Sequence, residues 1–123
     1  MNAAGGVLGR QLTLRVMDHR GNPARGEDNI RTLASDTGCL AVIGGVHTPV
    51  VLAELSVLHD LKLPMLIQWA AGTPLIDNGY KPNYVFRLFV RDELAGHFMV
   101  GELRARSIER VGLLLERTGG GAL

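Results

Sequence analysis

The sequence has little of several features that mark particular protein classes. Its 123 residues contain a single cysteine, Cys39, so no internal disulfide can form. Aromatic residues make up 5% of the chain, the formal net charge is +1, and no basic stripe appears, which argues against a nucleic-acid partner. No apolar run approaches the roughly 18 residues of a membrane-spanning helix.

The start of the chain also lacks the pattern of a secretion signal. Met1 is followed at once by Asn-Ala-Ala-Gly-Gly, with no basic start and no apolar stretch. If expressed as written, the chain is therefore expected to stay in the cytoplasm. Cys39 leads into an apolar run, which predicts an inert buried thiol.

Metal and cofactor signatures are missing too. His19, His59 and His97 show no metal-ligand spacing, so we expect solvated or internally satisfied histidines and no metal. Gly44-Gly45 is not followed by the pattern G-x-G-x-x-G, and no dinucleotide cofactor is expected. Hydrophobic residues nevertheless make up 46% of the chain and charged residues 20%, which supports one packed domain over residues 1–123.

Hydrophobic periodicity predicts alternating strands and helices. We expect strands over 11–17, 40–44, 65–67, 84–89 and 110–116, and helices over 23–37, 49–61 and 92–107. Alternation in the first strand indicates a half-exposed edge, whereas the apolar run over 40–44 indicates a central strand. This order predicts an α/β fold: a three-layer α/β/α sandwich with a mostly parallel, Rossmann-like sheet and helices on both faces.

Helix ends and buried faces follow from the same pattern. Asn22, Thr48 and Asp92 are expected N-caps, and Gly38 is an expected C-terminal stop. The predicted inward-facing residues are Ile30, Leu33, Ala34, Thr37, Val51, Leu55, Leu58, Ala95, Phe98, Met99 and Leu103.

One stretch, Ala41-Val-Ile-Gly-Gly-Val-His-Thr-Pro49, organises the rest of the chain. It is typical of a buried strand, a tight turn and a helix start, and such a start offers free backbone N–H groups to polar ligands. Ligands of open α/β sheets bind at the carboxyl ends of strands, where this turn lies. We therefore predict a crevice in which Val46 to Thr48 lie beside Ala70 to Thr73, the latter in the long irregular segment over 68–83.

Four ordered segments carry a family resemblance. They are Asn2-Ala-Ala-Gly-Gly-Val-Leu-Gly-Arg, Ala41-Val-Ile-Gly-Gly, Pro64-Met-Leu-Ile-Gln-Trp-Ala-Ala-Gly-Thr-Pro and Tyr84-Val-Phe-Arg. Together they resemble the first lobe of the type I periplasmic binding proteins, in particular the branched-chain amino acid group that serves ABC importers.

The resemblance implies a function and a place. It implies a solute-binding component of an ABC importer for branched-chain amino acids or related small carboxylates, without catalysis. The importer's membrane subunits would be partners, and the full-length family is periplasmic. Family members also have a secretion signal, a first strand and helix, and a second lobe, so this chain resembles a partial first lobe without them.

The resemblance also implies site residues. Thr48 matches a ligand-binding hydroxyl position, and His47 beside it stands where the family often has a small residue. Ala70 matches a position whose carbonyl accepts the ligand's ammonium group. Gly72 falls where many members have a threonine, and Thr73 comes one residue later. The expected ligand-binding set is His47, Thr48, Trp69, Ala70, Ala71, Gly72 and Thr73.

Several of these residues have more than one interpretation. Thr48 is expected to cap the helix, which does not exclude a ligand contact. Trp69 either lines the crevice or packs under the loop. His47 is a polar ligand contact, a base or a surface residue, but no Ser or Cys nucleophile with a supporting acid is recognisable, so we expect no catalytic residue and no enzyme.

A second function remains open: a self-associating structural module that binds no ligand. Without the family's first strand, the strands over 12–17 and 40–44 would either pair directly or leave a gap between them. Bare strand edges and apolar surfaces predict a homodimer, with or without exchanged elements.

Overall fold

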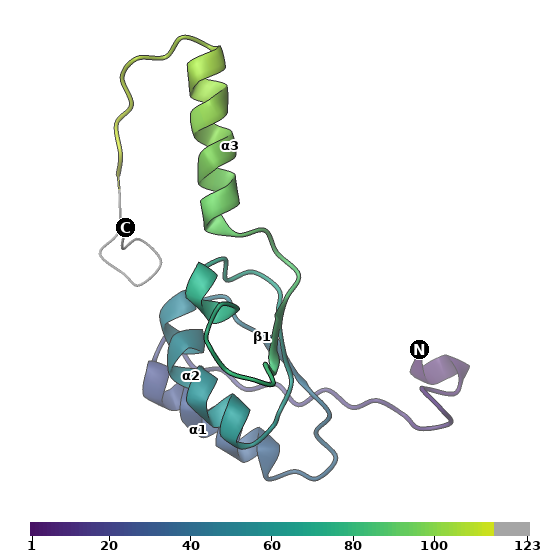
Figure 1. Cartoon of the computed structure of the whole chain (residues 1–123). Helices are drawn as coiled ribbons and strands as arrows, with labels where there is room; N and C mark the ends of the chain where they lie inside the picture. Colours follow the sequence, from purple (N-terminus) through teal and green to yellow (C-terminus); the bar gives the residue numbers. More distant parts are fainter. Residues whose placement is uncertain (115–123) are drawn as a thin grey trace.

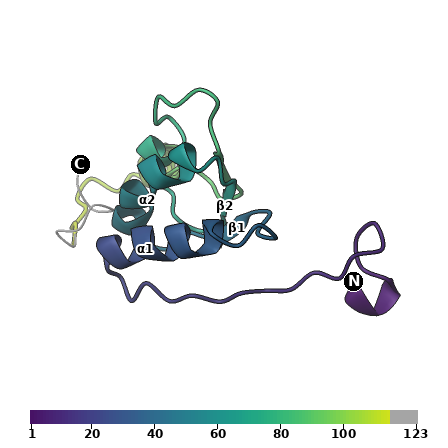
Figure 2. The same cartoon turned by 90° about the horizontal axis from the view of Figure 1, so that it is seen from below.

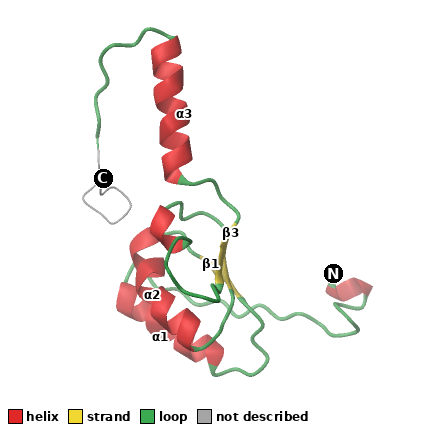
Figure 3. Ribbon diagram, viewed as in Figure 1, coloured by secondary structure: helices red, strands yellow, loops and turns green. Residues whose placement is uncertain are grey.

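The computed structural model describes residues 1–114. In chain order the elements are η1 (Asn2–Ala4), α1 (Pro23–Ala34), β1 (Val42–Gly44), α2 (Thr48–Asp60), β2 (Met65–Ile67), η2 (Thr73–Leu75), β3 (Val85–Arg87) and α3 (Asp92–Ala105). Figures 1 and 3 show a small helix-and-sheet body, an extended N-terminal segment that leaves it toward the right, and α3, which projects upward from it.

The three strands form a parallel sheet in the order β1-β2-β3. This confirms the predicted α/β class and parallel sheet. The apolar run at β1 is an edge strand of the described sheet and not its centre, because β2 lies between β1 and β3. The prediction that β1 is a central strand was wrong, since no described strand pairs with its outer edge.

Helices α1 and α2 lie together on one side of the sheet (Figure 2). Val51, Leu55 and Leu58 of α2 are buried as predicted, and they join Ile30 of α1 and side chains of β2 and β3 in one cluster. The cluster comprises Ile30, Val51, Leu55, Val57, Leu58, Leu63, Met65, Ile67, Ala70, Leu75 and Val85. Burying such side chains is the main favourable term in folding.

The other face of the sheet carries an apolar row that runs across all three strands. Ile43, Leu66 and Phe86 are paired in register, and Ile43 and Phe86 are 67% and 53% exposed. The described residues place α1 and α2 on the opposite face only. The second helical layer of the expected sandwich is not supplied by residues 1–114.

Helix α1 begins as its sequence predicts and ends early. The Asn22 side chain accepts a hydrogen bond from the Arg25 N–H at 3.1 Å, and Pro23 occupies the first turn. The predicted extension to Thr37 and stop at Gly38 were wrong. The helix ends at Ala34. The chain then turns, and the Asp36 carboxylate stabilises this turn by accepting the Gly38 N–H at 2.9 Å.

The extended segment over 11–17 forms no strand, so that prediction was wrong. It runs alongside the body without a ladder, and Leu14 and Val16 on its apolar face are exposed. Alternation alone does not make a strand, because backbone N–H and C=O groups need a partner. The same correction applies to the predicted last strand, since residues 110–114 are irregular and Leu115 and Glu116 lie outside the described residues.

Helix α3 forms as predicted but buries none of its residues. The expected inward set of Ala95, Phe98, Met99 and Leu103 was wrong for this chain, and Phe98 is 71% exposed. The predicted cap at Asp92 was also wrong: Arg91 holds the N-cap position and Asp92 is the first helical residue. No helix in the described residues is long and apolar enough to cross a membrane.

His59 anchors the long segment over 68–83 to the end of α2. Its buried ring places Nδ1 2.6 Å from the Leu55 carbonyl oxygen, and Nε2 accepts the Tyr84 N–H at 3.2 Å. Tyr80 stacks on the ring at a centroid distance of 3.8 Å. His59 is thus an internally satisfied histidine, as the sequence predicted.

Candidate functional site

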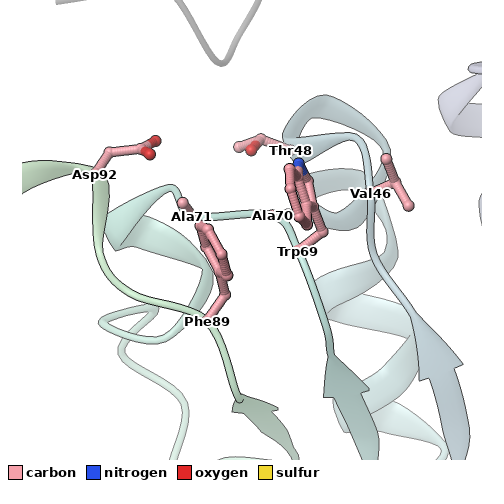
Figure 4. Close-up of a pocket in the computed structure, with 7 residues that line it drawn as sticks. All are labelled: Val46, Thr48, Trp69, Ala70, Ala71, Phe89 and Asp92. Atoms are coloured by element: carbon pink, nitrogen blue, oxygen red, sulfur yellow. The ribbon is translucent and has the colours of Figure 1, made fainter. Parts of the chain in front are cut away.

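An open crevice of about 340 Å³ lies where the chain leaves the carboxyl ends of the three strands. It is lined by Val46, Thr48, Trp69, Ala70, Ala71, Phe89 and Asp92. Figure 4 shows the segment after each strand contributing to it. The predicted meeting of Val46 to Thr48 with Ala70 to Thr73 is confirmed, since carboxyl ends of parallel strands share one edge of the sheet.

The predicted site residues divide into two groups. Thr48, Trp69, Ala70 and Ala71 line the crevice, whereas His47, Gly72 and Thr73 do not. His47 is exposed and its ring lies edge-on to His19 at 5.8 Å. Because His47 is absent from the crevice lining, its side chain has no described role there.

The start of α2 differs from the prediction in one respect. His47, not Thr48, holds the N-cap position and makes no side-chain capping bond. The Val50 N–H donates to the His47 carbonyl at 3.1 Å, and Pro49 has no N–H to donate. This leaves the Thr48 N–H and hydroxyl without a hydrogen-bond partner among the described residues, at the positive end of the helix dipole.

The loop after β2 presents backbone groups to the same space. The Ala70 N–H donates to the Gly45 carbonyl at 2.8 Å, while no hydrogen bond among residues 1–114 uses the Ala70 carbonyl. Gly72 packs against Thr48, so that a methyl group at Gly72 would lie 2.9 Å from Thr48 Cγ2. The crevice therefore offers both a donor and an acceptor from the main chain.

An aromatic wall closes one side. The Trp69 and Phe89 rings stack at a centroid distance of 4.9 Å and an interplanar angle of 24°. Trp69 is 61% exposed, so it lines the crevice and does not pack under the loop. Offset aromatic pairs of this kind form stable apolar surfaces for a ligand side chain.

Phe89 and Asp92 were missed from the sequence as site residues. Phe89 was assigned to a strand and Asp92 to a helix cap, yet both follow β3 and reach the crevice. The rule that ligands gather at carboxyl ends of strands applied to this third strand as well. Figure 4 shows the Asp92 carboxylate and the Thr48 hydroxyl at the open rim on opposite sides.

The lining sets the chemistry that the crevice offers. It combines one carboxylate, one hydroxyl, main-chain donors and acceptors, and an apolar wall. Such a lining suits a small molecule with an ammonium group and an apolar side chain. Among the described residues, no group of three or more His, Cys, Asp or Glu side chains is placed to hold a metal ion.

Solved structures resemble this chain. An ABC transporter substrate-binding protein from Desulfitobacterium hafniense is 27% identical, with a TM-score of 0.83. A second structure, titled as an ABC transporter substrate-binding protein from the same organism in complex with Leu, is also 27% identical, with a TM-score of 0.84. Each match covers 98% of this chain and 35% of the other. A comparison with curated proteins gave no match.

The family is shown by a match to a family model. Residues 1–122 match the family model described as a periplasmic binding protein. The match spans almost the whole chain, and the parallel sheet and its crevice agree with it. The chain belongs to the type I periplasmic binding protein family.

Proposed function

We infer that the crevice binds the solute of an ABC importer, a free amino acid with an apolar side chain such as leucine. The observation that carries this proposal is the pairing of main-chain polar groups at Thr48 and Ala70 with the aromatic wall of Trp69 and Phe89. An amino acid has the same division between a charged end and an apolar end.

Each group has a role in this proposal. The N–H and hydroxyl of Thr48 hydrogen-bond the ligand carboxylate, which the helix dipole also favours. The Ala70 carbonyl and the Asp92 carboxylate accept from the ligand ammonium. Trp69 and Phe89 contact the side chain and remove apolar surface from water.

The expected affinity is weak. The chain spans about a third of the length of the solved structures that it resembles, and the crevice is open on one side. Tight binding of a small molecule requires burial of most of its surface. We expect a Kd in the millimolar range at best, which corresponds to about −4 kcal/mol.

Isothermal titration calorimetry with leucine, isoleucine and valine tests this function. Thr48→Ala and Trp69→Ala should each weaken binding, because they remove a carboxylate donor and half of the aromatic wall. His47→Ala is the matched control, since its side chain lies outside the lining. Absence of heat with any amino acid up to tens of millimolar, or micromolar affinity, would contradict the proposal.

The wider role follows from the family. As part of a longer protein, this chain would form part of the first of two lobes, work in the periplasm and deliver its solute to an importer's membrane subunits. The chain has no proposed catalytic step, because periplasmic binding proteins of ABC importers bind and release their solute unchanged.

A second candidate function is self-association. The apolar row of Ile43, Leu66 and Phe86, in which Ile43 and Phe86 are exposed, and the unburied face of α3 are surfaces that a second copy would cover. Light scattering at micromolar concentration tests this proposal. A homodimer should give twice the mass of 13.3 kDa, and a monodisperse monomer would contradict it.

A further inference from the structure

Arg87 ends β3, and its side chain contacts the loop that follows β2. It is half-buried, and its Nη1 donates to the Ala71 carbonyl at 2.6 Å and to the Gly72 carbonyl at 3.0 Å. Both bonds come from the positively charged guanidinium group, which makes them stronger than neutral hydrogen bonds. Arg87 is absent from the crevice lining, so any effect on a ligand passes through the loop.

The Ala71 carbonyl also has a second donor. The Asp92 N–H, at the start of α3, donates to the same oxygen at 3.2 Å. One carbonyl thus joins the loop after β2, the end of β3 and the beginning of α3. Ala71 and Asp92 both line the crevice, so this oxygen ties two of its walls together.

We propose that Arg87 is the positioning residue of the crevice, holding the Ala71–Gly72 turn in place so that both walls keep their separation. The use of this crevice by an amino acid rests on the proposed function above. The positioning itself is a property of the protein without ligand. Loss of the guanidinium leaves the Gly72 carbonyl without this donor and the Ala71 carbonyl with one donor only.

Lysine should not replace arginine here. Its ammonium is charged, but its side chain is one bond shorter than that of arginine, so its nitrogen stops short of the position of Arg87 Nη1, which donates both bonds. Arg87→Lys therefore keeps the charge and most of the packing while it removes the reach to the two carbonyls. This variant separates the effect of positioning from the effect of charge, and it provides the test if Arg87→Ala fails to fold.

Trp69 reports on the loop directly, because it is the only tryptophan of the chain and stacks on Phe89. We would measure acrylamide quenching of its fluorescence in the parent chain, Arg87→Ala and Arg87→Lys. Since Trp69 is 61% exposed, full release of the ring raises the quenching constant by up to about 1.6-fold. Both variants should move toward that limit, with a shift of the emission to longer wavelength.

Arg91→Ala is the matched control. Arg91 lies between β3 and α3, and it pairs with Asp77 at 2.9 Å in a solvent-accessible ion pair. Its loss should leave Trp69 quenching unchanged, because exposed pairs contribute little. Unchanged quenching in both Arg87 variants, or an equal rise in Arg91→Ala, would overturn the proposal.

Calorimetry with leucine then separates this inference from the proposed function. If the parent chain binds leucine, Arg87→Ala and Arg87→Lys should raise Kd about tenfold, whereas Arg91→Ala should not. If the parent chain does not bind leucine, the proposed function fails, and the Trp69 measurement alone still decides the positioning role. A Kd unchanged in both Arg87 variants would overturn the link to the ligand.

Discussion

Gly72 packs directly against Thr48, and a methyl group at Gly72 would lie 2.9 Å from Thr48 Cγ2. This separation is below ordinary van der Waals contact, so the loop after β2 approaches α2 as closely as glycine allows. The threonine side chain is β-branched and has few alternative rotamers to relieve the contact. The shape of the crevice therefore depends on the absence of one methyl group.

Gly72→Ala should push the loop away from α2 and lower stability by about 1–3 kcal/mol, the range for overpacked sites. The free energy of urea unfolding measures this loss. Gly96→Ala in the exposed helix α3 is the control, because nothing lies within 4 Å of the added methyl group. That control should be neutral or slightly stabilising, since alanine favours helix. Equal behaviour of the two variants would contradict the close packing at Gly72.

A second close approach joins α1 to α2. A methyl group at Gly26 would lie 2.6 Å from both Glu54 Oε1 and Val50 Cγ1. Gly26→Ala should therefore destabilise the chain by about 1–3 kcal/mol, although alanine is the better helix former. Thermal unfolding followed by circular dichroism provides the measurement. A raised midpoint would show that the two helices separate without cost.

Glu54 makes stability depend on pH. Burial between α1 and α2, with a smaller contribution from Glu27, raises the pKa of the Glu54 carboxyl from 4.5 to about 7. The folded chain thus binds this proton more tightly than the unfolded chain. This proton binding stabilises the folded chain fully below about pH 4.5. The stabilisation, up to about 3 kcal/mol in all, is lost as pH rises through about 7.

Glu54→Gln removes this titration and should raise stability at pH 8 by up to that amount, with little difference from the parent chain near pH 4. Urea unfolding at the two pH values gives the comparison. Glu109→Gln is the control, because Glu109 is exposed in the irregular segment after α3. A gain at pH 8 no larger than the gain at pH 4 would argue against a buried, protonated Glu54.

The cap of α1 is the simplest local prediction. Asn22→Ala removes the side-chain acceptor of the Arg25 N–H and should lower stability by about 1 kcal/mol. Asn22→Ser retains an N-cap oxygen and should stay close to the parent chain. Denaturant unfolding of the three chains separates these outcomes, and equal losses in both variants would contradict the capping role.

Much of the fold follows from local sequence. Periodicity located all three helices and the three strands that form, and Asn22-Pro23 marked the start of α1 because its capping bond spans only three residues. The crevice was also predictable in part. The glycines at the end of β1 and the Thr-Pro start of α2 placed Thr48 at the edge of the sheet where the crevice lies, since parallel strands share their carboxyl ends.

Other features depended on contacts between distant segments. Residues 11–17 have the alternation of a strand, yet pairing requires a neighbouring ladder that the described residues do not provide. Helix α3 has an apolar face, but periodicity does not say what covers it, and nothing in residues 1–114 buries it. Phe89 and Asp92 were assigned local roles because their distance from Thr48 is set only by the folded chain.

The sequence by itself therefore determined the three α-helices, the three strands that form, the parallel sheet and the family, because these depend on residue pattern and short-range bonds. Tertiary structure alone decided which apolar faces are buried and how Arg87 meets the Ala71 carbonyl, 16 residues away. It also decided that Glu54 lies 4% exposed against Gly26. Burial and charge at these positions arise from neighbours that the local sequence does not specify.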